Sequence, residues 1–84
     1  LKIENFFELK KEINESNFDY NKINDLFFFK SGRWDIKMDT GLLIKLPKKN
    51  IKGSLKIAMQ IMNKSDKKIK MIDLRQFKQI IINE

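Results

Sequence analysis

The feature that most limits how this chain can fold is a stretch in which apolar and polar residues alternate one by one. It runs from residue 33 to residue 46, around a break at Asp39-Thr40-Gly41. Alternation with a period of two is typical of β-strands with one buried face. Because glycine readily adopts the left-handed backbone conformation of tight turns, the break predicts a hairpin with Gly41 in that conformation.

The turn also predicts which residues of the two strands face each other. One face of the hairpin then holds only apolar pairs, and the other face holds a pair of opposite charges, so the register agrees with both patterns. The apolar pairs are Met38–Leu42, Ile36–Ile44 and Trp34–Leu46, and the charged pair is Asp35–Lys45.

A third strand is expected immediately before the hairpin, at residues 26–30, with a turn at Ser31-Gly32. Counting back through a two-residue turn places Phe27 and Phe29 on the apolar face, so we expect both in the core. Phe28 is expected to point to the opposite face. The three strands form a meander.

Two amphipathic helices are expected, one from residue 1 to about residue 15 and one from residue 51 to about residue 63. In both segments apolar residues recur at the spacing of one helix face. The expected apolar faces are Ile3, Phe6, Phe7, Leu9 and Ile13 in the first helix, and Ile51, Leu55, Ala58, Met59 and Met62 in the second. The expected boundary residues are Ser16, Asn17 and Asp19 after the first helix, Pro47 after the third strand, and Asn50 as the N-cap of the second helix.

The last third of the chain predicts a second hairpin. A polar turn at residues 64–68 leads into strands at 69–75 and 79–83, joined through Gln76, Phe77 and Lys78. The expected register sets Leu74 against Ile80 and Ile72 against Ile82.

The terminal strand is open to two interpretations. The run Ile80-Ile81-Ile82 is typical of a strand that packs on both faces. At the edge of a sheet, however, it leaves backbone groups free to pair with another chain, either a partner or a second copy.

These elements predict an α+β fold: an antiparallel, mixed β meander of about five strands with two packed amphipathic helices, in the order α-β-β-β-α-β-β. A chain of 84 residues can bury only one small core, so residues 1–84 are expected to form a single domain.

The amino-acid composition excludes most classes of enzymatic reaction. The chain has no His and no Cys, and its three glycines are too far apart for a phosphate-binding loop, so we expect no catalytic, metal or cofactor site. Its net charge of +7 permits binding to nucleic acid, but only Arg33 and Arg75 are arginines. A small basic nucleic-acid-binding domain is therefore the alternative to a protein-binding role.

The segments Ser31–Met38, Gly41–Pro47 with Asn50, and Ile72–Arg75 occur in an order and spacing that resemble a known family. They are similar to the GRW strand, the Gly-led strand ending in LP, and the I-D-L-R strand of the C-terminal β domain of the bacterial cell-division FtsQ/DivIB family. The resemblance covers most of the chain, from the first helix to the last strand.

The resemblance implies a non-enzymatic scaffold of the divisome that supports septum assembly. It implies a location on the periplasmic side of the inner membrane, in a single-pass protein whose transmembrane helix and POTRA domain would precede Leu1. No apolar run here approaches the ~20 residues that span a bilayer, so we expect the chain to be a piece of that protein.

The implied partners are FtsB-like and FtsL-like divisome proteins, with other septal cell-wall synthesis proteins as further candidates and no nucleic acid. In the family the partner adds a strand to the terminal edge strand. The residues expected to contact the partner are Arg75, Gln76, Lys78, Gln79, Ile80, Ile81, Ile82 and Asn83.

Overall fold

The computed structural model describes residues 2–65, 68–76 and 78–84. Leu1, residues 66 and 67 of the expected polar turn, and Phe77 of the expected terminal loop lie outside the described residues. The elements are α1 (Ile3–Glu15), the short 3₁₀ helix η1 (Tyr20–Lys22), β1 (Ile23–Phe28), β2 (Trp34–Met38), β3 (Leu43–Lys45), α2 (Ile51–Lys64), β4 (Met71–Gln76) and β5 (Gln79–Asn83). This order confirms the predicted α+β arrangement.

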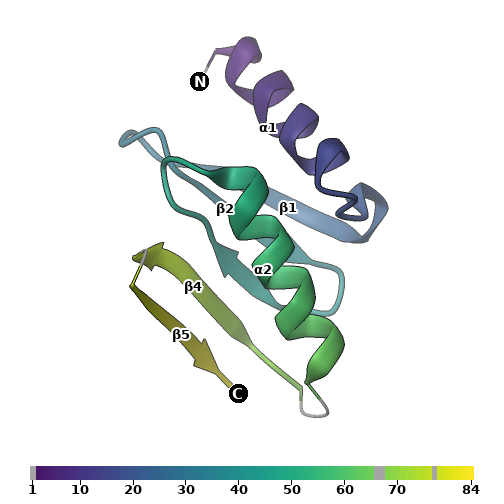
Figure 1. The fold of residues 1–84 in the computed structure, drawn as a ribbon. Helices are drawn as coiled ribbons and strands as arrows, with labels where there is room; N and C mark the ends of the chain where they lie inside the picture. The colour runs from purple at the N-terminus through teal and green to yellow at the C-terminus, as the bar shows by residue number, and fades with distance from the viewer. Residues whose placement is uncertain (1, 66–67, 77) are drawn as a thin grey trace.

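The strands form one sheet in the order β1-β2-β3-β4-β5. All neighbouring strands are antiparallel except β3 and β4, which are parallel. Parallel neighbours need a long crossover, and α2 supplies it by running back along one face of the sheet (Figure 1). The sheet therefore ends at β1 on one side and at β5 on the other.

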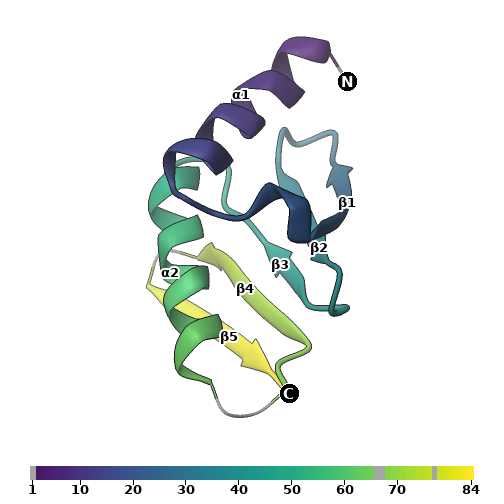
Figure 2. The same cartoon turned by 90° about the vertical axis from the view of Figure 1, so that its right-hand side faces the viewer.

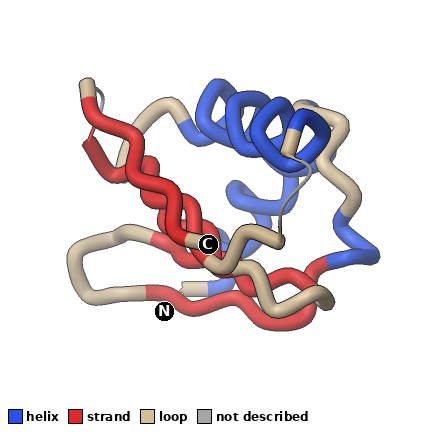
Figure 3. The backbone as a smooth tube through the Cα atoms, turned by 90° about the horizontal axis from the view of Figure 1, so that it is seen from below, coloured by secondary structure: helices blue, strands red, loops and turns tan. Residues whose placement is uncertain are grey.

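The core lies between the sheet and the two helices, which are on the same side of it (Figures 2 and 3). A row of aliphatic side chains crosses the helix-covered face from one edge to the other. Its members are Leu26, Ile36, Ile44, Ile72 and Ile82, of which the central three are fully buried. We call the opposite side of the sheet the open face.

The predicted central hairpin is confirmed. Ile36 faces Ile44 and Asp35 faces Lys45. At its ends the backbone N–H of Met38 donates to Leu42 O at 2.8 Å, and that of Leu46 donates to Trp34 O at 3.1 Å. Gly41 has a φ of +92°, the left-handed conformation that the turn requires.

The predicted placement of the phenylalanines in β1 is wrong. Phe28, not Phe29, lies opposite Trp34, and the two rings are 4.7 Å apart between centroids. The N–H of Phe29 donates to Arg33 O at 2.9 Å, so the turn holds three residues rather than two. One extra residue moves every side chain of the strand to the other face. Phe27 and Phe29 are consequently 44% and 40% exposed on the open face.

Only part of the predicted apolar face of α1 is buried. Leu9 and Ile13 lie in the core and Phe6 is half-buried, whereas Ile3 and Phe7 are exposed. The C-terminal half of α1 lies beside the start of α2, and its N-terminal turns extend away from α2 (Figures 1 and 2). The exposed pair lies in those N-terminal turns.

The second helix begins after Asn50, as predicted, but Asn50 does not cap it through its side chain. Its backbone is left-handed, with φ 59° and ψ 47°. The N–H of Lys52 instead donates to Oε2 of Glu12 in α1, at 2.9 Å. Lys52 Nζ also lies 3.2 Å from Oε1 of Glu15. The carboxylate of Glu12 in α1 therefore caps the N-terminus of α2, which is the role predicted for Asn50.

The terminal hairpin confirms one of its two predicted pairs, Ile72 with Ile82. Further along, the ladder shifts by one residue between Asp73 and Gln76, and Gln76 pairs with Gln79. The predicted pair of Leu74 and Ile80 lies within this irregularity and is not part of the observed register. Strand β4 consequently continues to Gln76, one residue past the predicted end.

Candidate functional site

Strand β5 is the last strand of the sheet, and all five of its residues are exposed. Ile80, Ile81 and Ile82 are 43%, 41% and 44% exposed. The interpretation of this run as a strand packed on both faces is therefore wrong. Its outer edge borders no other described strand, so part of its backbone N–H and C=O groups have no ladder partner there.

The three isoleucines point to both faces of the sheet. Ile81 lies opposite Asp73 and so belongs to the open face. Ile82 lies opposite Ile72, on the helix-covered face. Because the side chains of a strand alternate, Ile80 lies on the same side as Ile82.

Two hollows lie on the helix-covered side of β5. One, of about 380 Å³, is lined by Ile57, Leu74 and Ile80, with Lys48, Lys49 and Arg75 among its other lining residues. The other, of about 420 Å³, is lined by Ile61, Ile69 and Ile82, together with Lys64 and Glu84. Each hollow could accept an apolar side chain of a segment that pairs with β5.

Arg75, near the end of β4, is held by Asp73 on the open face. Its Nε lies 2.9 Å from Asp73 Oδ1, and its Nη2 lies 2.7 Å from Oδ2. The backbone N–H of Arg75 also donates to Oδ1, at 3.0 Å. These hydrogen bonds and the charge of Arg75, with a smaller effect from Lys45, lower the pKa of Asp73 although burial opposes the shift. The carboxylate in turn raises the pKa of Arg75.

A second arginine–aspartate pair lies on the same face, two strands away. Arg33 Nη1 lies 2.7 Å from Asp35 Oδ1 and donates to Leu46 O at 3.0 Å. Its guanidinium also stacks over the ring of Phe29, 4.8 Å from the centroid. The two aspartates belong to one row across the open face, formed by Phe27, Asp35, Lys45, Asp73 and Ile81.

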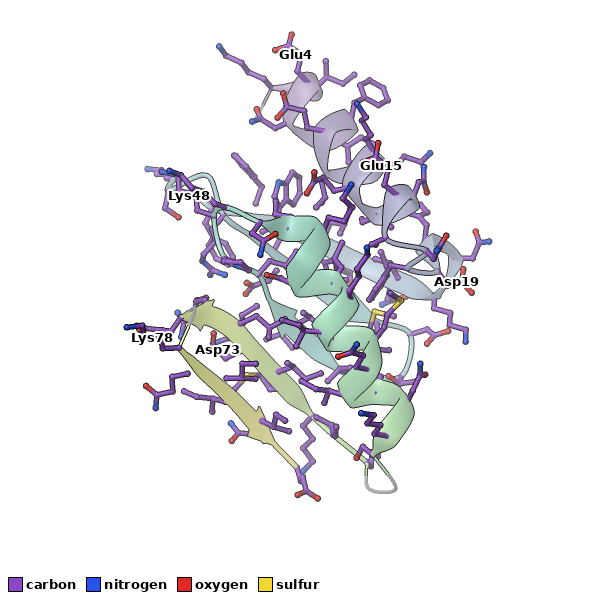
Figure 4. The ribbon with its side chains drawn as sticks, viewed as in Figure 1. Glu4, Glu15, Asp19, Lys48, Asp73 and Lys78 are labelled. Carbon is purple, nitrogen blue, oxygen red and sulfur yellow. The ribbon has the colours of Figure 1, made fainter. Side chains whose placement is uncertain are left out.

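The predicted partner-contacting residues lie together along one edge. Arg75 and Gln76 end β4, Lys78 extends outward from the turn that follows (Figure 4), and residues 79–83 form β5. All eight are exposed. Sequence reasoning missed Asp73, although its signal is present: it stands two residues before Arg75, on the same strand face.

The acid stability of the domain is expected to depend on Asp73. The pKa of Asp73 is lower in the folded state than in the unfolded state. The ion pair therefore stabilises the fold fully at pH values above ~3.9, the ordinary pKa of aspartate. This stabilisation is lost as the pH falls through the pKa of the folded state. Asp73→Asn is expected to lower the free energy of unfolding at pH 7 by about 1–2 kcal/mol.

Urea unfolding between pH 7 and pH 2 measures this effect. The difference between the wild type and Asp73→Asn is expected to shrink as the pH falls below 4. An equal difference at all pH values would contradict the assignment of the pKa shift to this carboxylate.

The described residues hold no cluster of three or more carboxylates that could bind a metal ion. Within the same residues, neither helix is long and apolar enough to cross a membrane.

The comparisons with known proteins identify a family for most of the chain. A family model for the C-terminal domain of the cell division protein FtsQ/DivIB matches residues 3–75. The matched residues run from the start of α1 to Arg75, so β5 lies beyond them. No curated protein matches the chain.

Proposed function

The chain belongs to the FtsQ/DivIB family of cell division proteins, and on this basis we propose that it is a non-enzymatic scaffold that binds a partner strand at β5. The family implies a role in cell division. The observation that carries the proposal is the exposure of three consecutive isoleucines on a strand at the edge of the sheet.

An added strand would gain affinity from two sources. Its backbone would pair with the free N–H and C=O groups of Gln79 to Asn83, an interaction that tolerates many sequences. Its alternate side chains would cover Ile81 on the open face and enter the hollows beside Ile80 and Ile82 on the other. Burial of these side chains would supply the apolar part of the binding energy.

The residues that flank β5 would determine which partner binds. Arg75 offers a charged hydrogen-bond donor on the open face, and Gln76 and Lys78 add polar groups at the adjoining turn. The proposed partners are the FtsB-like and FtsL-like proteins of the divisome. The proposed location is the periplasmic side of the inner membrane at the septum, with a membrane anchor elsewhere in the full-length protein.

An amide NMR titration tests this proposal. The probe is a synthetic peptide with the C-terminal periplasmic segment of the FtsB-like protein from the same organism, added at low and at high salt. We expect shifts concentrated in residues 75–83 that persist at high salt, since backbone pairing and apolar burial do not depend on counterion release.

Two results would contradict the proposal. One is the absence of any shift with the peptide. The other is binding of a DNA oligonucleotide, with salt-sensitive shifts over residues 48–56, which would favour the basic nucleic-acid-binding alternative.

A further inference from the structure

The N-terminal turns of α1 carry an apolar patch that the fold does not bury. Ile3 and Phe7 are four residues apart, so their side chains lie next to each other on one side of the helix. They are 67% and 57% exposed, more than any other large hydrophobic residue in the described part of the chain. These turns and β5 lie at opposite ends of the molecule (Figures 1 and 2). The patch is therefore separate from the surface of the proposed function.

Two opposite charges lie beside this patch, one toward each of its ends. Glu4 is exposed and points away from the body of the domain (Figure 4). The side chain of Lys11 is 76% exposed, and its contact with Glu15 in the same helix is long, at 4.0 Å. Glu4 and Lys11 are seven residues apart, which is about two helical turns, so both lie on the same side of the patch.

The spacing of these charges makes the patch complementary to a second copy of itself. Phe7 lies between them, about 4.5 Å along the helix axis from Glu4 and about 6 Å from Lys11. If two α1 helices pack antiparallel about a twofold axis at Phe7, the two Phe7 rings meet at the centre. Glu4 of each copy then lies level with Lys11 of the other copy.

The same arrangement covers Ile3. In the antiparallel pair Ile3 lies level with Lys10 of the other copy, on the opposite side of the contact from the charges. Lys10 Nζ is held over the ring of Tyr20, 5.1 Å from the centroid. The methylene groups of Lys10 are thereby held along the helix surface, where they can pack against Ile3 of the second copy.

We propose that the N-terminal half of α1 is a self-association surface, through which two copies of the domain pair with their α1 helices antiparallel. A second copy fits the patch because it sets an opposite charge against Glu4 and against Lys11 at once. The patch is much smaller than a standard interface, so the dimer is expected to be weak, with a dissociation constant of about 0.1–1 mM. Because α1 and β5 lie at opposite ends of the domain, pairing leaves both β5 strands accessible to partners.

Amide NMR and sedimentation between about 0.05 and 2 mM protein test the inference over the expected range of dissociation constants. We expect concentration-dependent shifts in residues 3–11 and sedimentation that fits a monomer–dimer equilibrium. Phe7→Lys is expected to abolish both, because it places two like charges at the twofold axis. Phe27→Lys, the same change at another exposed phenylalanine, is the matched control and is expected to leave the dissociation constant within twofold.

A charge exchange separates pairing from a general effect on the helix. Glu4→Lys alone and Lys11→Glu alone are each expected to weaken self-association about fivefold, because both opposite-charge contacts of the dimer become like-charge contacts. In an equimolar mixture of the two variants, the mixed dimer regains two opposite-charge contacts. Labelling one variant with ¹⁵N is expected to show an affinity for the other variant within twofold of the wild-type value, which a damaged helix would not give.

Four results would overturn the inference. The first two are the absence of any concentration dependence and a mixture that associates no better than the single variants. The third is a set of concentration-dependent shifts centred on residues 79–83, which would mean that copies pair through β5. The last is a set of shifts in residues 3–11 when the partner peptide is added to the monomeric domain, which would assign the patch to the partner. The first two leave the proposed function unaffected, whereas peptide shifts in residues 3–11 instead of residues 75–83 would contradict both.

Discussion

Replacing Trp34 with alanine is expected to lower the free energy of unfolding by about 3–5 kcal/mol. Trp34 is buried at the start of β2, and its ring packs against that of Phe28. Alanine would leave a cavity between the sheet and the helices that their fixed backbones cannot close. Domains of this size have total stabilities of about 5–15 kcal/mol, so the variant would lose a large share of its stability.

Unfolding in guanidinium chloride, monitored by circular dichroism, measures this loss of stability. The phenylalanines of β1 and the turn after it provide the controls. Phe28→Ala is expected to cost about 2–4 kcal/mol because its ring is packed against the core. Phe27→Ala and Phe29→Ala are expected to cost less than about 1 kcal/mol, since both rings are exposed. Equal costs for the three would contradict the register of β1.

Changing Ile81 to lysine is expected to weaken binding of the partner peptide about thirtyfold, equivalent to about 2 kcal/mol. The charge would stand on the strand that receives the partner, where it would have to lose water on binding. Lysine on an edge strand is also a device by which natural sheets discourage the addition of another strand.

The control is Phe27→Lys at the other edge of the sheet. Phe27 and Ile81 lie at the two ends of the same row, each opposite a buried aspartate, and their exposures are 44% and 41%. The two variants therefore introduce the same charge into similar surroundings. Phe27→Lys is expected to leave the affinity within twofold, and a comparable loss in both variants would place the binding site somewhere other than β5.

The parts of the fold that could be predicted are those fixed by local rules. The alternation of residues 33–46 and the position of Gly41 determine the central hairpin without reference to the rest of the chain. The apolar spacing of the two helices is local in the same sense. By contrast, which side chains of β1 point to the core depends on the number of residues in the turn between β1 and β2. The sequence near Gly32 is compatible with a turn of two residues and with one of three.

The candidate site was predictable only in part, for a related reason. The pairing of β5 with β4 follows from the predicted hairpin, whereas the position of β5 at the edge depends on the order of all the strands in the sheet. The exposure of its isoleucines could not be predicted, because that of Ile80 and Ile82 depends on how far α2 extends over the sheet, and Ile81 lies on the opposite face. The sequence pattern places Asp73 and Arg75 on the same face of one strand. It does not predict their hydrogen bonds, because these depend on the rotamers of both side chains.

The carboxylate of Glu12 at the start of α2 has a consequence for the order in which the domain folds. The cap and the N–H that it satisfies are 40 positions apart in the chain. The N–H of Lys52 cannot form this hydrogen bond until α1 has docked, whatever the helix propensity of residues 51–64. Closing a loop of this length costs entropy before the contact stabilises anything. The joining of the two helices is therefore expected to be a late event in folding.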